Sequence, residues 1–545
     1  MRKHIEPRRH LITFQSSMLP HIFTDVLVIG SGVAGLSAAI AAAEHSNVLV
    51  VAKDAVRETN TEHAQGGIAV ALHPDDSIES HFKDTMEVGY GLCEPEVVRL
   101  IVSEGPDRIR ELLGWGADFD RRDNTLEFAR EGGHSRPRII HAHGDSTGTE
   151  LQRSLLMKCR ECKRIKVIEY SFAIDLLTLD NTCHGALIDR KDKGLVLAWA
   201  KQTILATGGL GQTYRETTNP DVATGDGFAM AYRAGAQLRD MEFVQFHPTT
   251  LYIAGASRTL ITEAVRGAGG ILRNRHGERF MPRYHKDAEL APRDVVSRAI
   301  LVEMRDTKDT NVYLDLTHLS SNQLDKRFPR IRKLCNEFDI DISEEFFPVC
   351  PSAHYAIGGV AVDANGCTTV NNLLACGEVS STGLHGANRL GSNSLLEGLV
   401  YGRRAGCCAG ETASLSTAKL TQHKLQDRIG STHSHSHIDI EDVRNSLKSL
   451  MWRCVGPERS ARGLEDAKQR IDFWCSYVFA AEFKDPEGWM LQNMLTVSKM
   501  INVCALARHE SRGAHYRTDF PSTDDKDWKR HSIIQKKVSG ERQCT

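Results

Sequence analysis

The sequence predicts an α/β + α fold, in which a domain built on a parallel β-sheet is split by an inserted segment and followed by a C-terminal helical bundle. Three observations predict it. A strand, a glycine-rich turn and a helix come near the start, two further strand-and-glycine blocks follow at 196–211 and 357–400, and apolar residues recur at helical spacing after residue 440. At 545 residues the chain also exceeds what one hydrophobic core holds, so roughly two to four domains are expected.

The first block runs from residue 24 to 54. Residues 25–29 (DVLVI) are an apolar run typical of a buried parallel strand, and an alanine-rich helix and a second strand follow the turn GSGVAG. In that turn Gly30 permits a sharp bend, Gly32 lets the backbone approach a pyrophosphate, and Gly35 lets the helix pack against the strand. Because the motif follows a strand and opens a helix, it indicates a Rossmann-like dinucleotide-binding domain more strongly than a glycine turn without a ligand.

One position departs from the dinucleotide pattern. The acidic residue that normally ends the second strand and binds the ribose is replaced by Lys53, with Asp54 after it. From the residues alone, this departure is compatible with a phosphorylated ribose or with a different way of holding the ribose. The motif therefore predicts a dinucleotide and leaves its type open.

Two later blocks are expected to complete the same sheet. Residues 204–207 (ILAT) form a strand before a Gly-Gly pair, and residues 357–400 end in an Ala/Gly-rich helical pattern. The segment between Arg239 and Tyr355 lacks this pattern, so we expect it to be an insertion in a split domain.

Composition and charge exclude several classes of function. Sixty-eight basic and 70 acidic side chains leave no basic excess, so no nucleic-acid partner is expected. No apolar run reaches the roughly 18 residues of a membrane span, so no membrane partner is expected. Fourteen cysteines are scattered through a long chain, which predicts reduced thiols and a cytoplasmic location. Only Cys159 and Cys162 form a C-x-x-C, and no second pair lies at metal-ligand spacing, so one face of a charged helix is favoured over a redox or zinc role and no metal is expected. Residues 1–23 lack a secretory signal and are expected to be a disordered extension.

The C-terminal part changes character twice. Residues 413–439 are rich in Ser, Thr and His, which indicates a linker. His433, His435 and His437 alternate along the chain, so a metal site remains an alternative, although a solvated linker is favoured. From residue 440 the helical spacing of apolar residues predicts a small bundle with a loose, charged end.

A series of motifs gives the chain a family resemblance. From about residue 25 to 521, and in this order, it contains GSGVAGLSAA, AQGGIAVAL, REGGHS, ATGG, TTNPDVATGDG, FVQFHPTTL, LITEAVRG, RFMP, ELAPRDVVSRAI, PSAHYAIGGV, GEVSSTGLHGANRLGSNSLLEGLVYG and ARHESRGAH. These stretches resemble the L-aspartate oxidases, which are members of the succinate dehydrogenase and fumarate reductase flavoprotein superfamily. The resemblance implies a split Rossmann-like FAD-binding domain (24–240 and 355–412), an inserted α+β capping domain (241–354), the linker, and a C-terminal helical domain (440–545).

Two positions distinguish the members of this superfamily. Covalent flavoproteins of the respiratory complexes resemble S-H-T-x-x-A-Q-G-G, in which the histidine is linked to the flavin. Here the linking position holds Asn60, and His63 lies at the wrong place in the motif, so FAD is expected to be bound non-covalently. The second position is Glu131 in REGGHS, where the dicarboxylate dehydrogenases resemble F-G-G-Q-S.

Glu131 has two interpretations. By spacing alone, a loop residue paired with Arg130 or Arg136 is favoured. The resemblance favours instead a group that pairs with the ammonium of an amino diacid, because an ammonium buried without a partner is costly. The negative charge of Glu131 would also disfavour binding of a dicarboxylate that has no ammonium group.

The resemblance also implies the other site residues. Arginine forks and imidazoles suit the two carboxylates of such a substrate, and the matching positions are His247, Thr262, His354 and Arg389. The implied catalytic residues are Arg293, nearest the reacting carbons, together with Glu131 and with Glu263 on a proton path. The implied FAD-binding residues are Gly30, Ser31, Gly32, Val33, Ala34, Gly35, Lys53, Asn60, Thr61, Glu62, His63, Ala64, Gln65, Gly66, Gly67, Asp226, Glu378, Ser394 and Leu395.

The reaction implied is FAD-dependent oxidation of L-aspartate to iminoaspartate by hydride transfer to flavin N5, with oxygen, giving hydrogen peroxide, or fumarate as electron acceptor. It would be the first step of de novo NAD biosynthesis via quinolinate, with a quinolinate synthase as a candidate pathway partner. One alternative is a soluble fumarate reductase or succinate dehydrogenase flavoprotein subunit, against which Glu131 and Asn60 argue. The other is a non-catalytic flavin-binding scaffold, against which Arg293, Arg389 and His354 argue.

Overall fold

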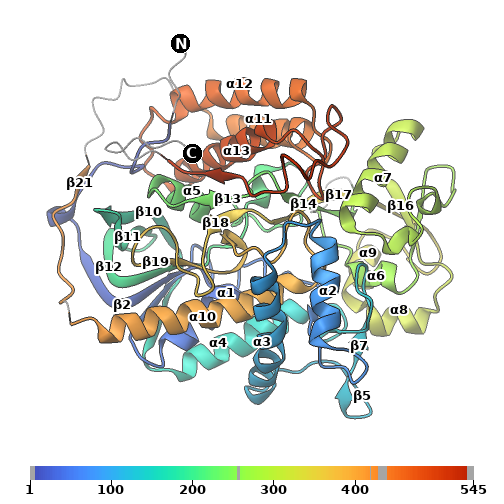
Figure 1. Ribbon diagram of the computed structural model, residues 1–545, viewed down its shortest axis with the longest axis horizontal. Helices are drawn as coiled ribbons and strands as arrows, with labels where there is room; N and C mark the ends of the chain where they lie inside the picture. Colours follow the sequence, from blue (N-terminus) through green and yellow to red (C-terminus); the bar gives the residue numbers. More distant parts are fainter. Residues whose placement is uncertain (1–5, 254–257, 418, 428–437, 537–545) are drawn as a thin grey trace.

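The computed structural model of the chain describes residues 6–253, 258–417, 419–427 and 438–536, and its structure is mixed α/β. Figure 1 shows three regions: a sheet with helices beneath it, the C-terminal helices drawn in orange and red above it, and the inserted segment drawn in yellow-green beside it. The three alternating histidines of the linker lie outside the described residues.

Within the described residues, the main sheet has seven strands in the order β10-β11-β12-β2-β3-β9, with β19 beside β12. Strands β12, β2, β3 and β9 run parallel, and β19 is parallel to β12, whereas β10, β11 and β12 form antiparallel pairs. The central parts of these strands, such as residues 26–29 of β2 and all of β3, are apolar and buried because both faces of the sheet are covered there. The bounds are β2 His21–Ile29, β3 Val48–Val51, β9 Ile165–Ile168, β10 Ser171–Leu179, β11 Thr182–Arg190, β12 Gly194–Leu205 and β19 Leu373–Ala375.

Helix α10 (Asn393–Leu415) packs closely on α1 (Val33–Ala42) because its contact positions are glycines. A Cβ atom at Gly402 would lie 2.6 Å from the carbonyl oxygen of Ala34, and one at Gly406 would lie 2.3 Å from that of Ala38. Both helices begin at the same cavity, which is lined by the first residues of each. Close packing of the two helices therefore fixes the relative position of two parts of that cavity.

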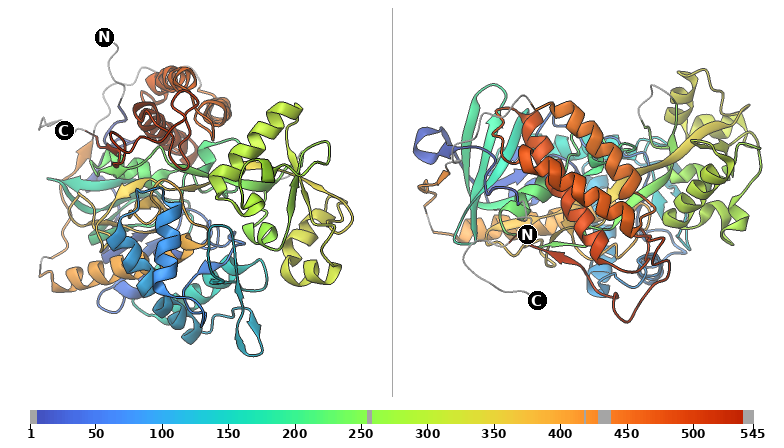
Figure 2. Two further views of the ribbon diagram at one scale, coloured as in Figure 1. Left: turned by 45° about the vertical axis from the view of Figure 1, so that its right-hand side comes forward. Right: turned by 90° about the horizontal axis from the view of Figure 1, so that it is seen from above.

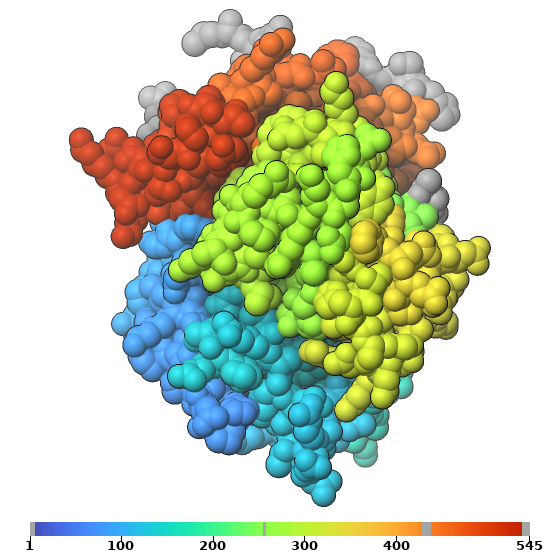
Figure 3. Space-filling view, turned by 90° about the vertical axis from the view of Figure 1, so that its right-hand side faces the viewer, coloured from blue at the N-terminus to red at the C-terminus, as the bar shows by residue number. Residues whose placement is uncertain are grey.

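The inserted segment has a sheet and an apolar core of its own. Figure 3 views this segment face on and shows it packed against both the blue-to-cyan N-terminal part and the red C-terminal part of the chain. Its sheet has the order β14-β17-β16-β15. The elements are β14 Val244–Leu251, α6 Glu263–Gly267, β15 Ile271–Arg273, α7 Arg293–Thr307, β16 Val312–Asp315, α8 Ser321–Arg327, α9 Pro329–Asn336 and β17 Phe347–Ala356.

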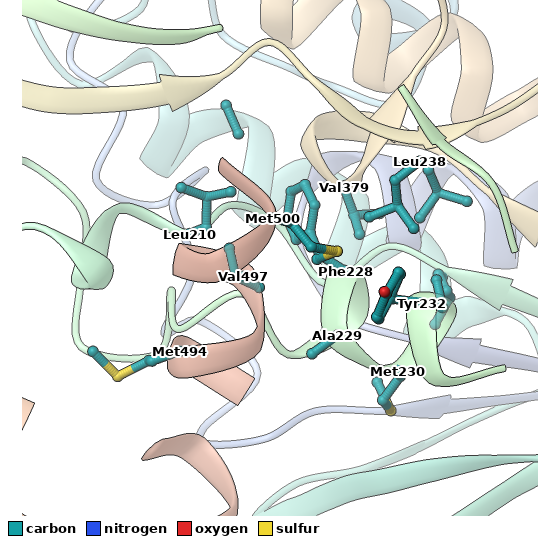
Figure 4. Packing of buried hydrophobic residues seen from close by; sticks show 14 of the residues in the cluster. Leu210, Phe228, Ala229, Met230, Tyr232, Leu238, Val379, Met494, Val497 and Met500 are labelled. Carbon is teal, nitrogen blue, oxygen red and sulfur yellow. The ribbon is translucent and has the colours of Figure 1, made fainter. Parts of the chain in front are cut away.

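The C-terminal helices share a core with the sheet region. Helices α11 (Ile440–Cys454), α12 (Ala461–Val478) and α13 (Pro486–Ala507) lie across one face of the molecule, as Figure 2 shows from above. Side chains of α13 pack with those of α5 (Asp226–Arg233) in one buried cluster (Figure 4). The bundle is thus joined to the nucleotide-binding part by apolar packing as well as by the chain.

Shorter elements complete the fold. Helices α2, α3 and α4 belong to the first 161 residues, and the small strands pair with one another in separate sheets of two to four strands. Their bounds are β1 Phe14–Gln15, β4 Ile68–Ala69, α2 Ile78–Val88, α3 Pro95–Gly114, β5 Arg121–Arg122, β6 Thr125–Leu126, β7 Phe128–Ala129, β8 Ile139–Ile140, α4 Thr147–Glu161, β13 Leu238–Arg239, β18 Gly359–Ala361, β20 Ser380–Ser381, β21 Gln426–Asp427 and β22 Ile533–Ile534.

The start of the chain differs from the expected disordered extension. Among residues 6–23, Leu11, Ile12 and Phe14 are buried in an apolar cluster with Trp199 of β12. This stretch is basic in composition, but it contains three apolar side chains. They pack between the main sheet and helix α13. The expectation of disorder was therefore wrong for the described residues of this segment.

The described part of the C-terminal tail, residues 524–536, also differs from the loose tail that we expected. Strand β22 pairs with β13 in antiparallel fashion. Just before it, His531 lies between Asp240 and Glu94 and forms a hydrogen bond with each. The tail is thus fixed to the sheet region by a short strand and an ionisable side chain.

We expect His531 to make stability depend on pH. Burial lowers the pKa of His531, but the hydrogen bond and charge of Asp240 outweigh it, so the pKa is raised above the ordinary 6.5. A raised pKa in the folded state means that the stabilisation is complete below about pH 6.5 and is lost as the pH rises through the folded value. Thermal melting should show His531→Gln less stable than wild type at about pH 6, with a smaller difference at about pH 9. A difference that does not change with pH would contradict this.

Three further features concern partners and ligands. In the described part of the chain, no helix is both long and apolar enough to cross a membrane. Over the same residues, no group of three or more His, Cys, Asp or Glu side chains is arranged to hold a metal ion. The 13 cysteines described there are all free thiols.

Candidate active site

A long cavity lies where the sheet region meets the inserted segment. All seven residues implied as catalytic or substrate-binding line it, and they come from distant parts of the chain: Glu131, His247, Thr262, Glu263, Arg293, His354 and Arg389. Of the implied FAD-binding residues, all line it except Gly35 and Glu62. The residues implied for FAD binding and those implied for catalysis and substrate binding therefore lie along one elongated cavity.

The two exceptions have other contacts. A Cβ atom at Gly35 would lie 2.1 Å from the carbonyl oxygen of Gly30, so Gly35 allows α1 to pack against β2 rather than contacting the cavity. The carboxylate of Glu62 lies 3.7 Å from Nε of Arg57, outside the cavity lining. Gly35 and Glu62 thus do not line the cavity, and their contact with FAD stays a prediction; the packing role expected for Gly35 agrees with its position.

The glycine-rich turn leaves room where side chains would clash. Gly30 has φ +116°, and a Cβ atom there would lie 2.0 Å from the carbonyl oxygen of Ala206 at the end of the neighbouring strand β12. Gly32 precedes the first turn of α1, and the backbone N–H of Val33 donates to Oγ1 of Thr61. The open backbone at the start of a helix suits an anionic phosphate.

Lys53 pairs with another implied cofactor residue. Its ammonium lies 2.8 Å from the Asp226 carboxylate and also donates to Oγ1 of Thr224 and to the carbonyl oxygen of Val222. Both charged groups line the cavity, so together they present a neutral pair where the simple dinucleotide pattern has one acid. The departure at this position therefore does not by itself create a site for an extra phosphate.

Glu378 is the buried acid at the nucleotide end. The backbone N–H of Ala356 and Nδ2 of Asn60 donate to its two carboxylate oxygens, at 3.0 and 2.9 Å. Burial raises the pKa of Glu378 to about 7 against the effect of these two donors. Asn60 occupies the position of the linking histidine and bonds to Glu378, whereas His63 is exposed and pairs with Glu58.

Two histidines and two arginines face each other at the other end of the cavity. The rings of His247 and His354 have centroids 5.1 Å apart, and Nδ1 of His354 hydrogen-bonds Oγ1 of Thr218 at 2.9 Å. Burial, and then the charges of Arg293 or Arg389, hold the pKa of both histidines well below the ordinary value. Both imidazoles are therefore neutral and can donate or accept a hydrogen bond.

The two arginines are buried and close enough to influence each other. Burial and the charge of Arg293 lower the pKa of Arg389 to about 10, and the Arg389 guanidinium stacks over Tyr355 at 4.4 Å. Two cations in one buried site repel each other unless an anion lies between them. This arrangement is suited to a carboxylate.

Arg293 is held from two sides at the start of α7. Its Nε donates to Glu263 at 2.7 Å, and one terminal nitrogen donates to Oε1 of Gln245 at 3.0 Å. Gln245 in turn donates to Oδ1 of Asn388 and to the carbonyl oxygen of Arg389. Glu263 also pairs with Arg266 at 3.1 Å, so its charge stays compensated.

Glu131 is a buried anion with two polar neighbours, Ser392 and His141. Its side chain is 2% exposed; Oε2 accepts a hydrogen bond from Ser392 at 2.9 Å, and Oε1 lies 3.4 Å from Nε2 of His141. Burial raises its pKa, but His141, His134 and Ser392 outweigh burial and lower the pKa to about 2. Arg130 donates instead to the carbonyl oxygen of His134, so the interpretation of Glu131 as an ion pair with Arg130 does not hold.

Several buried polar atoms along the cavity have no hydrogen-bond partner among the residues that the structure describes. At the nucleotide end they are Oδ1 of Asn60, Oε1 of Gln65 and Oγ1 of Thr207. At the other end they are Nε2 of His247, Nε of Arg389 and Oε1 of Glu131. Buried polar atoms are normally satisfied, so these atoms mark surfaces that fit a polar ligand. The glycine cradle at one end fits a dinucleotide, and the mixed charges at the other fit a small charged molecule.

Gln245, Ser392 and His141 were not among the predicted site residues, although Gln245 lies in the motif FVQFHPTTL and Ser392 in GSNSLLEG. Gln245 lies two residues before His247 in β14, and side-chain alternation along a strand was a signal that could have found it. Ser392 precedes α10 with φ +62° and adjoins the expected flavin-facing residues. Nothing in the sequence around His141 indicates its contact with Glu131.

Comparison with known proteins agrees with this geometry. The family described as FAD binding domain matches residues 25–395, and the family described as fumarate reductase flavoprotein C-term matches residues 444–544. Among curated proteins, the chain is 44% identical to a chloroplastic L-aspartate oxidase of Arabidopsis thaliana, over 92% of this chain and 82% of that protein. It is 41% identical to an L-aspartate oxidase of Streptomyces coelicolor, over 94% and 92%.

Solved structures give the same assignment. A quinol fumarate reductase of E. coli superposes with a TM-score of 0.87 at 32% identity, covering 94% of each chain. The Sdh1 complex of Mycobacterium smegmatis gives 0.82 at 33% identity, over 96% of this chain and 93% of that one. Extensive identity to the curated oxidases, together with the matched FAD-binding region, shows that this chain belongs to the L-aspartate oxidase family of FAD-dependent flavoproteins, within the succinate dehydrogenase and fumarate reductase superfamily.

Proposed function

We propose that this protein oxidises L-aspartate to iminoaspartate with non-covalently bound FAD. The observation that carries the proposal is the placement of Glu131 beside the arginine site. A Cβ atom at Gly391 would lie 3.1 Å from a terminal nitrogen of Arg293, 3.0 Å from Oε2 of Glu263 and 3.6 Å from Oε2 of Glu131. A buried anion so close to buried cations suits a substrate that carries both carboxylates and an ammonium.

FAD, when bound, supplies the acceptor for the hydride that leaves the substrate Cα. The glycine turn at 30–34, the stretches 59–61 and 63–67, and the acid Glu378 are the groups that would hold it, because they line the elongated end of the cavity. With Asn60 at the linking position and His63 paired to Glu58, these residues fit a cofactor held without a covalent bond.

The two carboxylates of the substrate would be bound by different groups. Arg389 and His354 would face one carboxylate, and His247 and Thr262 the other. All four line the cavity; His354 is half-buried and the other three are buried. Neutral imidazoles act here as hydrogen-bond donors that add no charge, so the arginines alone set the positive charge of the site. This division orients Cα and its hydrogen within the cavity.

Glu131 would bind the substrate ammonium. A carboxyl whose pKa is lowered to about 2 stays ionised at neutral pH, so it is a partner for a cation and a weak base. It therefore selects amino diacids by charge rather than by taking up the proton. The proton that the amine loses would leave through another acceptor near this end of the cavity.

Arg293 would polarise the substrate next to the reacting carbon. Glu263 and Gln245 hold its guanidinium from two sides, which fixes its direction before the substrate enters. Glu263 bridges Arg293 and Arg266, so a proton path along these three residues is part of the proposal.

The wider assignments follow from the same proposal. Residues 241–354 act as a capping domain that closes over the substrate and excludes water. Oxygen, giving hydrogen peroxide, or fumarate accepts the electrons, and the product enters NAD biosynthesis via quinolinate, with a quinolinate synthase as pathway partner. The free thiols favour a cytoplasmic location.

Anaerobic reduction of the bound flavin tests the proposed function. Adding L-aspartate to the purified holoprotein without oxygen should bleach the flavin absorbance, and the product mixture should contain oxaloacetate and ammonia formed by hydrolysis of iminoaspartate. Succinate should bleach it far more slowly. Bleaching by succinate without bleaching by aspartate would instead establish a fumarate reductase or succinate dehydrogenase flavoprotein.

A Glu378→Gln variant should separate protein stability from cofactor affinity. Because burial raises the pKa of Glu378 to about 7, its ionisation destabilises the folded apoprotein as the pH rises from about 4.5 towards 7. We expect the variant apoprotein to melt at a higher temperature at about pH 8. Its FAD affinity should fall about 10-fold or more, because a charged acceptor for the ribose hydroxyls is lost. Calorimetric melting and FAD titration measure the two effects, and equal FAD affinity in both proteins would remove Glu378 from the cofactor site.

A further inference from the structure

Two half-buried cysteines outside the cavity lie in contact. Cys367 ends the turn at 363–367, which precedes β19, and Cys408 lies in the second half of α10. Their sulfur atoms are 3.8 Å apart, although the residues are separated by 41 positions in the chain. A disulfide needs a sulfur separation of about 2.05 Å, and side-chain rotation of neighbouring cysteines can close such a gap.

The backbone around this pair is held firmly. The Asp363 carboxylate accepts the N–H groups of Asn365 and Cys367, at 2.8 and 2.9 Å. The turn packs directly on α10, since a Cβ atom at Gly366 would lie 3.0 Å from Cβ of Ala405. The closeness of the two sulfur atoms is therefore built into the packing of the turn on the helix.

Cys408 of the pair lines an open surface hollow. Cys407, three arginines and two glutamates line the same hollow, namely Arg108, Arg403, Arg404, Glu104 and Glu411. With Cys367 as hydrogen-bond donor, the pKa of Cys408 is lowered to about 7, so a large fraction is thiolate at neutral pH. Burial instead raises the pKa of the neighbouring Cys407. Cys408 is thus the more nucleophilic of two adjacent thiols.

We propose that Cys367 and Cys408 form a peroxide-reactive thiol pair, which a hydroperoxide converts into a disulfide between the 363–367 turn and α10. The sulfur contact, the fixed turn and the open hollow carry this inference. It does not depend on the proposed oxidation of aspartate, but that reaction would supply hydrogen peroxide whenever oxygen is the acceptor.

The reaction balances in two steps. The Cys408 thiolate attacks one oxygen of hydrogen peroxide, the O–O bond breaks, and Cys408 becomes a sulfenic acid while the other oxygen leaves as hydroxide and takes up a proton to form water. The Cys367 sulfur then attacks the Cys408 sulfur, the S–O bond breaks, and the leaving hydroxide takes the Cys367 proton as a second water. Two thiols and one peroxide thus give one disulfide and two waters.

The new bond would close a loop of the chain that contributes residues to the cavity wall. Residues 367–408 include Glu378, Arg389 and Ser392, all of which line the cavity. A covalent link at the ends of this segment limits its freedom in the unfolded chain. We therefore expect the oxidised protein to unfold at a higher temperature than the reduced protein.

Mass spectrometry of the full-length holoprotein tests the proposal. Treatment of the reduced protein with a small excess of hydrogen peroxide should lower the mass by about 2 Da, the mass of two hydrogen atoms. Peptide mapping without reductant should join the peptides that contain Cys367 and Cys408, and the melting temperature should rise. An unchanged mass, or a crosslink between other cysteines, would overturn the proposal.

Three variants assign the roles of the two sulfur atoms. In Cys367→Ser the sulfenic acid at Cys408 should persist and be trapped by a 1,3-dione reagent, because the resolving thiol is absent. In Cys408→Ser neither the trapped adduct nor the crosslink should form at Cys367. Cys407→Ser, which removes the adjacent half-buried thiol, should behave as wild type. Trapping at Cys367 in Cys408→Ser, or loss of the crosslink in Cys407→Ser, would contradict the assignment.

Discussion

Replacing Arg293 with leucine is expected to lower kcat for aspartate oxidation by about 1000-fold while the protein keeps its FAD. The guanidinium lies between Glu263 and Gln245, beside the place where the substrate carbon reacts in our proposal. Glu263 keeps its pairing with Arg266, so no unpaired charge is created and the variant should fold. Steady-state kinetics and the ratio of flavin to protein absorbance give the two measurements.

Arg293→Lys is the matched control for charge. A lysine retains the positive charge but cannot donate to both neighbours from a planar fork, so activity should be only partly restored. Retention of wild-type kcat in Arg293→Leu would exclude Arg293 from the chemistry. Loss of FAD in that variant would instead show that its role is structural.

Glu131→Gln should abolish most aspartate oxidation and leave fumarate reduction largely intact. The change keeps the size of the side chain but removes the negative charge that would pair with the substrate ammonium. Leaving a buried charge without its partner costs about 3 kcal/mol or more, which corresponds to at least about a 100-fold loss in kcat/KM for aspartate. Fumarate carries no ammonium, so its reduction by chemically reduced flavin should change much less.

Ser392→Ala is the matched control for this variant. It removes one hydrogen bond to Glu131 but keeps the carboxylate, so the loss with aspartate should be at most about 10-fold. Measuring both substrates with both variants separates charge recognition from packing. Equal losses with aspartate and fumarate in Glu131→Gln would show that Glu131 shapes the site without recognising the amine.

The sequence predicted the nucleotide end of the site where local chemistry determines structure. The turn at Gly30 and Gly32 needs residues without side chains, so one short sequence motif is enough to identify it. Lys53 shows the limit of such reasoning. Its partner Asp226 lies 173 positions away, and only the folded chain shows that the two charges neutralise each other.

The substrate end was predicted by resemblance rather than by spacing. Arg293, Glu131 and His354 come from separate elements, and no periodic pattern relates them. Contacts that support these residues, such as Gln245 with Arg293 and His141 with Glu131, depend on tertiary packing and were missed. The ordered structure of residues 6–23 was missed for the same reason. The burial of Leu11 depends on contacts with elements that are distant in the chain.

The split of the sheet region has a consequence for how the protein is made. Glu378, Arg389 and the start of α10 all follow the insertion in the chain, yet they line the same cavity as the glycine turn near residue 30. A growing polypeptide emerges from the ribosome with its N-terminal part first. The cofactor cradle therefore stays incomplete until roughly three quarters of the polypeptide has emerged, and flavin loading must come late in biosynthesis or after release.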